Sequence, residues 1–320
     1  MERRNYEEAL GLIEKWDSII IHRHTKPDGD AIASQKGLTE IIALNYPHKK
    51  VYMVGDSPSR YSFIAPEGMD DVDDSIFPSS LAILLDMSSP SLVSDERWKT
   101  AGDTLRFDHH LFIEPICRTE VIDSSRESCA GLVAEWALEM SLSLNREAAS
   151  ALFTGIVTDS GRFLYGNVSD VTFRVVSELV KYDFDRNSIF TNLYSEDFSA
   201  LKRKAYYLEK IEIGRGGVAW TYNTSLDVKK MGGTAFSISR GLVNSMANIK
   251  GVGIWVSFTE DDETGRILAE LRSRSADINA VAVKYGGGGH RNASGASLSS
   301  KDEAMRMLSD LETLGEEENE

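Results

Sequence analysis

The order of apolar and polar residues in the first half of the chain follows two alternating patterns. Continuous apolar runs that end in polar or acidic residues are typical of strands buried on both faces of a parallel sheet. Four such runs occupy residues 17–24, 49–55, 80–87 and 103–110. Segments with helical periodicity occupy residues 30–45, 127–141, 145–158 and 169–182. This alternation predicts an α/β fold with a parallel, Rossmann-like sheet.

The pattern changes in the second half of the chain. A helical segment at residues 199–213 precedes three alternating strands, at residues 216–224, 251–260 and 266–275. Strands with one polar face indicate a mixed, partly solvated sheet. We therefore expect a smaller C-terminal α/β domain with a mixed sheet. The predicted boundaries are 1–190 for the first domain, 191–213 for a linker helix that could belong to either side, and 214–316 for the second domain.

Composition narrows the class of protein. A chain of 320 residues is long enough for two domains that each bury a core. No apolar run approaches the roughly 20 residues needed to span a bilayer, so we expect a cytoplasmic protein without membrane contact. The net charge of −15 disfavours binding of long nucleic acid, which depends on many Lys and Arg. Cys117 and Cys129 are expected to be reduced thiols.

Carboxylates and imidazoles gather at the ends of the predicted strands. In an open parallel sheet, ligands bind beyond the carboxyl ends of the strands. The residues there are His24, Asp28 and Asp30 after the first strand, Asp86 after the third, Asp108, His109 and His110 after the fourth, and Asp159 at the end of an apolar helix. Four separate segments are therefore expected to bring these side chains to one rim.

The chemistry of this set fits a pair of divalent cations. Two ions about 3.5–4 Å apart need a bridging carboxylate, flanking ligands and open positions for water and substrate. We expect Asp86 to be the bridge, His24 and Asp28 to hold one ion, and Asp30, His109 and Asp159 to hold the other. Mixed imidazole and carboxylate ligands favour Mn²⁺ over Mg²⁺, with Zn²⁺, Co²⁺ and Fe²⁺ left open. A water between the ions would lose its proton near neutral pH and attack phosphorus.

Two further residues of this set have expected catalytic roles. Asp108 is expected to orient a ligand, and His110 to contact the phosphate or assist proton transfer. Each segment also has a simpler explanation when taken alone, as a turn at 28–30, a helix cap at Asp86, a surface loop at 108–110 or a helix end at Asp159. Four such coincidences at the ends of consecutive elements are improbable together.

A glycine-rich stretch, KYGGGGHRNASGA at residues 284–296, follows a short predicted helix. Its N–H groups could form an anion-binding nest, or the stretch could be a flexible loop. It matches neither a Walker loop nor a dinucleotide fingerprint, but His290 and Arg291 favour phosphate or nucleotide binding. Arg272 and Arg274 share one face of a predicted strand. They are expected to project into a cleft between the domains, with a solvated edge strand as the alternative.

Several motifs resemble those of the DHH phosphoesterase family. They are HTKPDGDAIAS, LLDMSSP, FDHH and TGIVTDSGRF, in the family's order. The opening is similar to that of the bifunctional oligoribonuclease and pAp phosphatase group. RSR and GGGH followed by N.SGA resemble the DHH-associated C-terminal domain. The resemblance implies a two-Mn²⁺ hydrolase with its active site in the cleft between the domains, and its ligand positions match the six metal candidates. The expected substrate-binding residues are Arg272, Arg274, Gly287, Gly288, Gly289, His290 and Arg162.

The leading hypothesis is therefore a Mn²⁺-dependent phosphoesterase. It would hydrolyse 3′-phosphoadenosine 5′-phosphate (pAp) to AMP and phosphate, and degrade short oligoribonucleotides to mononucleotides. Linear or cyclic dinucleotides such as pApA and c-di-AMP, or pyrophosphate, are alternative substrates for the same site. A non-catalytic nucleotide-binding module is a different class, against which the complete ligand set argues. The expected partners are short RNA and nucleotides, and a homodimer is kept open.

Overall fold

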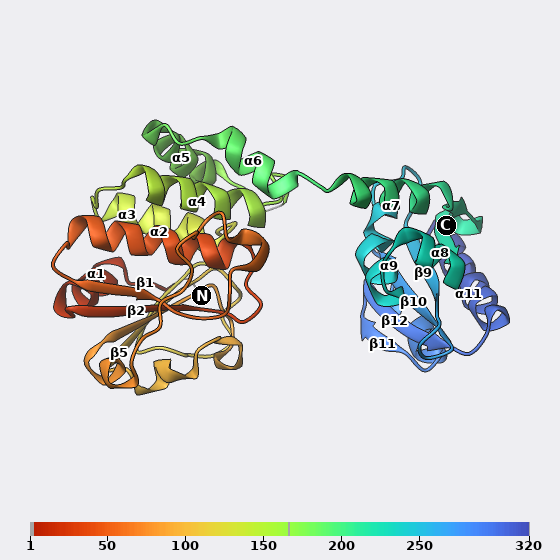
Figure 1. Cartoon of the computed structure of the whole chain (residues 1–320), viewed down its shortest axis with the longest axis horizontal. Helices are drawn as coiled ribbons and strands as arrows, with labels where there is room; N and C mark the ends of the chain where they lie inside the picture. The colour runs from red at the N-terminus through yellow and green to blue at the C-terminus, as the bar shows by residue number, and fades with distance from the viewer. Residues whose placement is uncertain (1–2, 166, 320) are drawn as a thin grey trace. The chain divides into compact units, whose positions relative to one another are not determined.

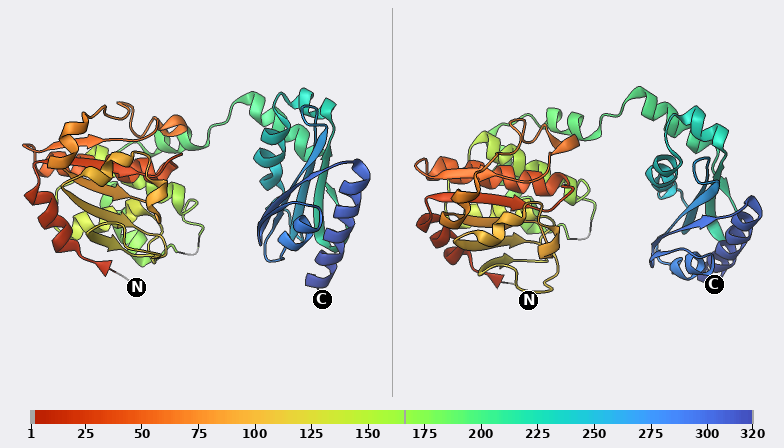
Figure 2. Two further views of the ribbon diagram at one scale, coloured as in Figure 1. Left: turned by 90° about the horizontal axis from the view of Figure 1, so that it is seen from below. Right: turned by 60° about the horizontal axis from the view of Figure 1, so that its bottom comes forward.

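The computed structural model describes residues 3–165 and 167–319. The chain divides into two compact units, Met1–Ser195 and Glu196–Glu320, shown in Figures 1 and 2. The helix predicted around residues 199–213 belongs to the second unit. The exact domain boundaries at residues 190 and 214 stay a prediction.

The first unit contains a six-stranded sheet with the order β1-β6-β5-β4-β2-β3. Its strands are β1 (Arg3–Arg4), β2 (Ser18–Arg23), β3 (Lys50–Met53), β4 (Leu81–Leu85), β5 (Asp103–Asp108) and β6 (Thr119–Ile122). All neighbours are parallel except β1, which pairs antiparallel with β6 at the edge. The parallel sheet is confirmed. The sequence pattern missed β1 and β6, because one has only two residues and the other carries a charged Glu120 among apolar neighbours.

The helices of this unit are α1 (Tyr6–Lys15), α2 (Gly29–Asn45), α3 (Cys129–Glu139), α4 (Arg146–Asp159), α5 (Asp170–Leu179) and α6 (Arg186–Tyr194). As Figure 1 shows, α2, α3 and α4 lie along one face of the sheet, with α5 and α6 outside them. Ile21, Leu105 and Trp136 are fully buried in the core between these layers. Short 3-10 helices, at Asp74–Ser79 and Glu96–Thr100, cover the opposite face.

The second unit contains a mixed six-stranded sheet with the order β11-β12-β10-β9-β8-β7. Its strands are β7 (Glu212–Ile213), β8 (Val218–Asn223), β9 (Ile254–Asp261), β10 (Arg266–Ser273), β11 (Gly288–His290) and β12 (Ala293–Leu298). β8 and β9 are parallel and the other neighbours are antiparallel, so the predicted mixed sheet is confirmed. The helices are α7 (Phe198–Glu209), α8 (Ser225–Met231), α9 (Ala235–Leu242), α10 (Asn279–Lys284) and α11 (Lys301–Asn319).

The expectation of a solvated sheet face is wrong for the centre of this sheet. Val256 and Trp255 are successive residues of β9, and they enter two different cores on opposite faces. Polar residues of β8 and β9 that indicated a wet face are buried, and the side-chain amide of Asn223 donates to the hydroxyls of Thr221 at 3.3 Å and Thr259 at 3.2 Å. The alternate residues of β10 remain partly exposed. Polar side chains can be buried where hydrogen bonds to one another replace those to water.

Two further features follow from the described residues. Cys117 and Cys129 are free and buried, as expected for reduced thiols. Between residues 3 and 165 and between 167 and 319, no helix combines the length and the apolar character needed to cross a membrane.

Candidate metal centre

The structure brings the six metal candidates together at the carboxyl end of the parallel sheet. They come from the loops after β2, β4 and β5, from the first turn of α2 and from the last residue of α4. Ligand atoms lie within 4.8 Å of one another in three groups, His24–Asp28–Asp86, Asp30–His109–Asp159 and Asp86–His109–His110. Two of these groups share Asp86 with different partners. The arrangement therefore has two adjacent positions for a cation.

Asp86 faces both positions with its two carboxylate oxygens. Its Oδ2 lies 3.5 Å from Nε2 of His24, and its Oδ1 lies 3.4 Å from Nε2 of His109. Asp86 is 3% exposed and has a left-handed backbone with φ of 58°, which is uncommon for a residue other than glycine and occurs most often at functional sites. Its Oδ1 is buried and accepts no hydrogen bond from the described residues. A buried carboxylate oxygen that accepts no hydrogen bond fits a divalent cation as its partner.

The two histidines are oriented by backbone carbonyl groups. The Nδ1 atom of His24 lies 2.9 Å from the carbonyl oxygen of Thr25, and that of His109 lies 3.3 Å from the carbonyl oxygen of Arg126. A ring whose Nδ1–H donates to a carbonyl keeps the Nε2 lone pair for a metal ion. In both residues Nε2 points toward the carboxylates. The donor set of two imidazoles and four carboxylates fits divalent ions of intermediate softness.

Asp28 and Asp30 are held by the starts of two helices. Asp28 is the N-cap of α2, where its Oδ1 accepts from the N–H groups of Asp30 and Ala31, each at 3.0 Å. The buried carboxylate of Asp30 accepts from the N–H groups of Cys129 at 2.7 Å and Ala130 at 2.9 Å, at the start of α3. Free N–H groups at a helix start stabilise a negative charge. The helix starts therefore fix these carboxylates before any ion binds.

A close approach between α2 and α4 makes room for this arrangement. A Cβ atom at Gly155 would lie 2.9 Å from both Oδ1 of Asp30 and Cβ of Ala33, and 2.5 Å from Cβ of Ala130. A larger side chain there would displace the carboxylate. Gly155 thus belongs to the packing beneath the centre, a role that the sequence analysis did not assign.

The cluster attracts positive charge strongly. Burial raises the pKa of Asp30 well above its ordinary range and that of Asp159 to about 6. The carboxylates of Asp28 and Asp86 raise the pKa of His24 to about 10. Burial works to lower the pKa of His109, but Asp86, Asp30 and Asp159 outweigh it and raise that pKa to about 10. Without an ion, the cluster holds protons instead.

Asp108 and His110 form a pair beside this centre. The buried carboxylate Oδ1 of Asp108 lies 2.7 Å from Nδ1 of His110 and 3.2 Å from its backbone nitrogen. His110 is partly exposed, and its Nδ1 lies 3.8 Å from Oδ1 of Asp86. Hydrogen bonding to Asp108 is the main cause of the raised pKa of His110. Asp108 therefore sets the orientation and basicity of His110.

A second support that the sequence analysis missed lies under the loop that follows β2. The carboxylate of Asp56 accepts from Thr25 Oγ1 at 2.8 Å and from the N–H group of Lys26 at 3.1 Å. The buried guanidinium of Arg23 donates to Gln35 Oε1 at 2.9 Å. These bonds fix the loop that carries the first metal candidates. In the sequence, these bonds are indicated only by two polar residues, Ser34 and Gln35, within an otherwise apolar helical segment.

The predicted substrate-binding arginines of the second unit differ in their partners. Arg272 Nη1 lies 3.1 Å from a carboxylate oxygen of Glu270 on the same face of β10. Arg274 lies just past the strand and donates to the carbonyl oxygens of Val252 at 2.9 Å and Ala247 at 2.6 Å. The guanidinium of Arg274 therefore closes a loop of its own unit. That of Arg272 has the ion pair with Glu270 and a hydrogen bond at 2.8 Å to the carbonyl oxygen of Leu271, its neighbour in the chain.

The glycine-rich stretch is more regular than a flexible loop. Gly288 and His290 bound β11, which pairs antiparallel with β12. The N–H group of Gly287 donates to the carbonyl oxygen of Ala282 at 2.9 Å, and Gly289 has φ of 142°. A Cβ atom at Gly287 would lie 2.1 Å from the carbonyl oxygen of Gly295. Close packing against β12 therefore explains Gly287 and Gly289, whereas a Cβ atom at Gly288 would meet no described atom within 4 Å. His290 at the end of β11 is exposed.

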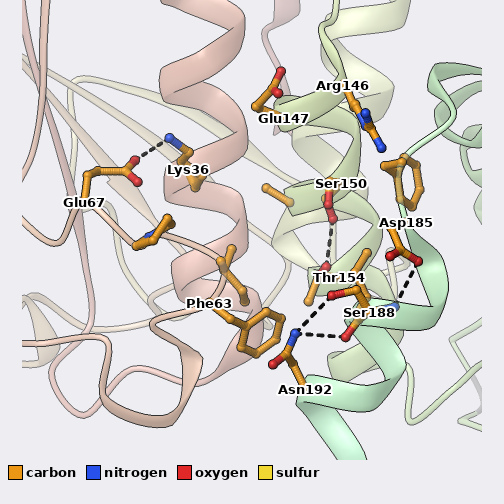
Figure 3. A pocket seen from close by; sticks show the side chains of 15 residues that line it. Lys36, Phe63, Glu67, Arg146, Glu147, Ser150, Thr154, Asp185, Ser188 and Asn192 are labelled. Atoms are coloured by element: carbon orange, nitrogen blue, oxygen red, sulfur yellow. Dashed lines mark hydrogen bonds and ion pairs between the residues drawn. The ribbon is translucent and has the colours of Figure 1, made fainter.

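A cavity of about 390 Å³ lies elsewhere in the first unit (Figure 3). Its lining includes Lys36, Phe63, Glu67, Arg146 and Asn192. Lys36 is neutralised there by Glu67 and by Glu40, whose carboxylate lies 2.8 Å from Lys36 Nζ. None of the metal candidates lines this cavity. The cavity is therefore distinct from the candidate metal centre.

Comparisons with known proteins agree with this fold and cluster. Residues 18–156 match the DHH family, N-terminal domain, and residues 223–317 match the DHHA1 domain. This chain belongs to the DHH phosphoesterase family. The cluster of aspartates and histidines at the strand ends agrees with that assignment.

Three relatives illustrate the similarity. The chain is 36% identical to the bifunctional oligoribonuclease and PAP phosphatase NrnA of Bacillus subtilis, over 97% of this chain and 98% of that protein. It is 32% identical to the protein of the same name from Mycoplasma genitalium, again over 97% and 98%. A solved structure of an exopolyphosphatase-related protein from Bacteroides fragilis has a TM-score of 0.79 and 26% identity, covering 98% of this chain and 97% of that one.

Proposed function

We propose that this protein hydrolyses pAp to AMP and phosphate and degrades short oligoribonucleotides to mononucleotides. The proposed cofactors are two divalent ions, with Mn²⁺ favoured by the mixed imidazole and carboxylate donors. The residues proposed to hold them are His24, Asp28, Asp30, Asp86, His109 and Asp159. The observation that carries the proposal is the position of Asp86, whose two oxygens face Nε2 of two different histidines at 3.5 and 3.4 Å.

The substrates are carried over from the relatives. Proteins named for both activities are similar to this chain over nearly its full length. The net charge of −15 supports a short substrate over long nucleic acid, because long polymers need many cations. We propose a cytoplasmic location without a membrane partner, and light scattering would test for a homodimer.

The side chains of the first unit have distinct proposed roles. When bound, the divalent ions supply an activated water nucleophile and neutralise charge on the phosphoryl group. Asp108 holds Nδ1 of His110 at 2.7 Å, which leaves Nε2 of His110 to contact the phosphate or to move a proton at the leaving oxygen. The braced carboxylates keep this geometry without reorganisation during the reaction.

The second unit is proposed to recognise the nucleotide. His290 and Arg272 are the side chains proposed to contact its phosphate or base, next to the glycines Gly287, Gly288 and Gly289, which permit close approach. Arg272 bonds only groups of its own strand through Nη1, Glu270 and the Leu271 carbonyl, whereas Arg274 holds the carbonyl groups of two residues outside its strand. We therefore assign Arg272 the larger share of substrate binding.

Turnover measurements test this function. Wild type and Asp86→Asn are compared on pAp with and without Mn²⁺, and then on pApA, cyclic dinucleotide and labelled RNAs of two to five nucleotides. Asparagine tolerates the left-handed backbone at this position, so loss of activity would report the lost carboxylate. Equal product release by both proteins would contradict the bridging role. Faster turnover of cyclic dinucleotide than of pAp and RNA would show that cyclic dinucleotide is the preferred substrate and would contradict the proposal.

A further inference from the structure

A strained turn directly follows Asp159. Gly161, Arg162 and Phe163 have φ values of 57°, 64° and 65°, so three successive residues adopt the left-handed conformation. This conformation is unfavourable for arginine and phenylalanine, and it persists only where surrounding contacts enforce it. Such strain is concentrated at functional sites. The turn therefore has a reason beyond connecting two helices.

Ser160 enforces this turn from beneath. Its buried hydroxyl accepts from the N–H group of Phe163 at 3.0 Å, and its carbonyl oxygen accepts from those of Leu164 at 3.0 Å and Tyr165 at 3.1 Å. As a result, Leu164 and Tyr165 are 73% and 64% exposed. A strained turn that exposes apolar side chains beside the candidate metal ligand Asp159 indicates a surface that contacts another molecule.

Arginine and aromatic side chains gather at this turn. The guanidinium of Arg162 lies over the ring of Tyr194 at 4.9 Å, and that of Arg60 lies over the ring of Tyr61 at 4.8 Å. Partial burial raises the pKa of Tyr194, and Arg162, Tyr61, Tyr165 and Arg60 all act on it electrostatically, so these groups lie near one another. We name Arg60, Tyr61, Arg162, Tyr165 and Tyr194 the arginine–tyrosine platform.

One part of the platform follows a metal candidate in the chain, and the other is hydrogen-bonded to the loop that carries one. Arg162 is three residues past Asp159. Arg60 lies in the loop after β3, and Asp56 in this loop accepts hydrogen bonds from Thr25 and Lys26, which directly follow His24. The platform is thus anchored to the same rim as the metal centre, within the first unit.

We infer that the arginine–tyrosine platform binds the nucleotide next to the scissile bond of an RNA oligomer, with its base stacked on an aromatic ring and its phosphate beside an arginine. This inference rests on the proposed function and adds the residues that would distinguish an oligomer from pAp. Flat aromatic rings interleaved with guanidinium groups are the usual surface for single-stranded RNA, because every base has a face to stack. The arginines already lie on rings, so little side-chain freedom is lost on binding.

Direct binding tests the platform apart from catalysis. Full-length Mn²⁺-loaded protein is titrated with a fluorescent RNA trinucleotide whose linkages are non-hydrolysable phosphonates. Tyr194→Ala should weaken binding by about 5- to 150-fold, the range of one lost base–aromatic stack, and Tyr194→Phe should retain it. The matched control is Phe236→Ala, an exposed aromatic paired with Arg240 at 5.6 Å in the second unit. It should bind as wild type does.

An abasic trinucleotide identifies the stacked base. Removal of the base next to the scissile bond should weaken wild-type binding as much as Tyr194→Ala does, and the two changes together should weaken it no further. Additive losses, or wild-type affinity in Tyr194→Ala, would overturn the inference. Tyr194 is 43% exposed, so its truncation leaves the core intact, and an unchanged melting temperature checks this.

Turnover separates the platform from the proposed function. In Tyr194→Ala, KM for trinucleotide RNA should rise by the same factor as the dissociation constant, while KM for pAp changes less than about twofold. An equal rise for both substrates would contradict the platform and leave the proposed function intact. If wild type cleaves neither substrate, the proposed function fails, and the binding series still decides whether the platform holds RNA.

Discussion

The metal centre of the first unit and the arginine and glycine face of the second unit differ in how their side chains are held. Asp30 and Asp86 are 1% and 3% exposed, and Asp30 is fixed by two backbone N–H groups. By contrast, His290 is exposed, and the guanidinium of Arg272 bonds only neighbouring groups of its own strand, Glu270 and the carbonyl of Leu271. The residues proposed to hold ions are positioned before binding, whereas the residues of the second unit proposed to hold the nucleotide can still rearrange.

This difference follows from the ligands. A pair of small ions requires oxygen and nitrogen atoms within a narrow range of distances, so the donors must be fixed by a rigid scaffold. A nucleotide is larger and tolerates several contact geometries. Substitutions in the first region should therefore affect catalysis and metal content, and those in the second region should affect KM.

The largest effect is expected at Asp86. Asp86→Asn replaces one of the two carboxylate oxygens with an amide nitrogen and removes the negative charge between the two cation positions, so kcat should fall by about 10³-fold or more because the bridging ligand is lost. Metal analysis of the purified variant should find fewer than two ions per chain. Asp71→Asn, at an exposed aspartate, is the matched control. Two bound ions per chain in Asp86→Asn would contradict the bridging role of Asp86 and the proposed difference between the two regions.

A smaller loss of rate is expected at Asp108. Asp108→Asn keeps the shape of the side chain but removes the charge that holds Nδ1 of His110 at 2.7 Å. Loss of such an outer partner typically costs about 10- to 100-fold in activity. Steady-state kinetics on pAp should show this loss in kcat, with metal content near that of wild type. A change in KM alone would instead assign the pair to substrate binding.

Arg272 and Arg274 provide a matched pair in the second region. Arg272→Ala should raise KM for pAp by roughly tenfold, the effect of losing one charge-assisted hydrogen bond, without changing metal content. Arg274→Ala should instead lower the melting temperature of the protein, because the carbonyl groups of Ala247 and Val252 lose their donor. The reverse pattern, with KM raised only in Arg274→Ala, would exchange their roles.

The smallest effect is the pH dependence of stability in the metal-free protein. The pKa values of His24 and His109 rise to about 10 in the folded chain, above the ordinary value near 6.5. Their contribution to stability is therefore fully present below pH 6.5 and is lost as the pH rises through about 10. Urea midpoints with EDTA should fall between pH 6.5 and 9.5.

Two controls separate this effect from other titrations. The variant with both His24→Gln and His109→Gln should show a flatter pH profile in EDTA. With Mn²⁺, the profile should reverse, because ligand imidazoles must be neutral to bind an ion. An unchanged slope in the double variant would show that other groups control the dependence.

The sequence predicted those parts of the molecule that side-chain type and spacing determine. Buried strands and their acidic ends have a clear pattern, so the parallel sheet and the position of Asp86 could be foreseen. The solvated face expected in the second unit was wrong for the centre of the sheet, because Asn223 and Thr221 are polar but buried against each other. Periodicity does not distinguish a polar side chain in water from one in a buried network.

The supports of the metal centre were not predictable for a different reason. The N–H groups of Cys129 and Ala130 hold Asp30 from about 100 residues away along the chain, and every residue other than proline carries such a group. The partners of Arg274 are likewise backbone carbonyls. Backbone donors and acceptors leave no trace in residue type, so only the folded chain reveals them.

Asp30 joins two roles in one side chain, since its carboxylate both faces the centre and accepts the first N–H groups of α3. A mutational scan that measures only cell growth would find substitutions of Asp30 and of Asp159 equally harmful. Substitution of Asp30, however, would also remove the hydrogen bonds that hold the start of α3. Suppressors of Asp30 lesions should therefore accumulate in the first turn of α3, next to Ser128, and restore protein abundance without restoring turnover.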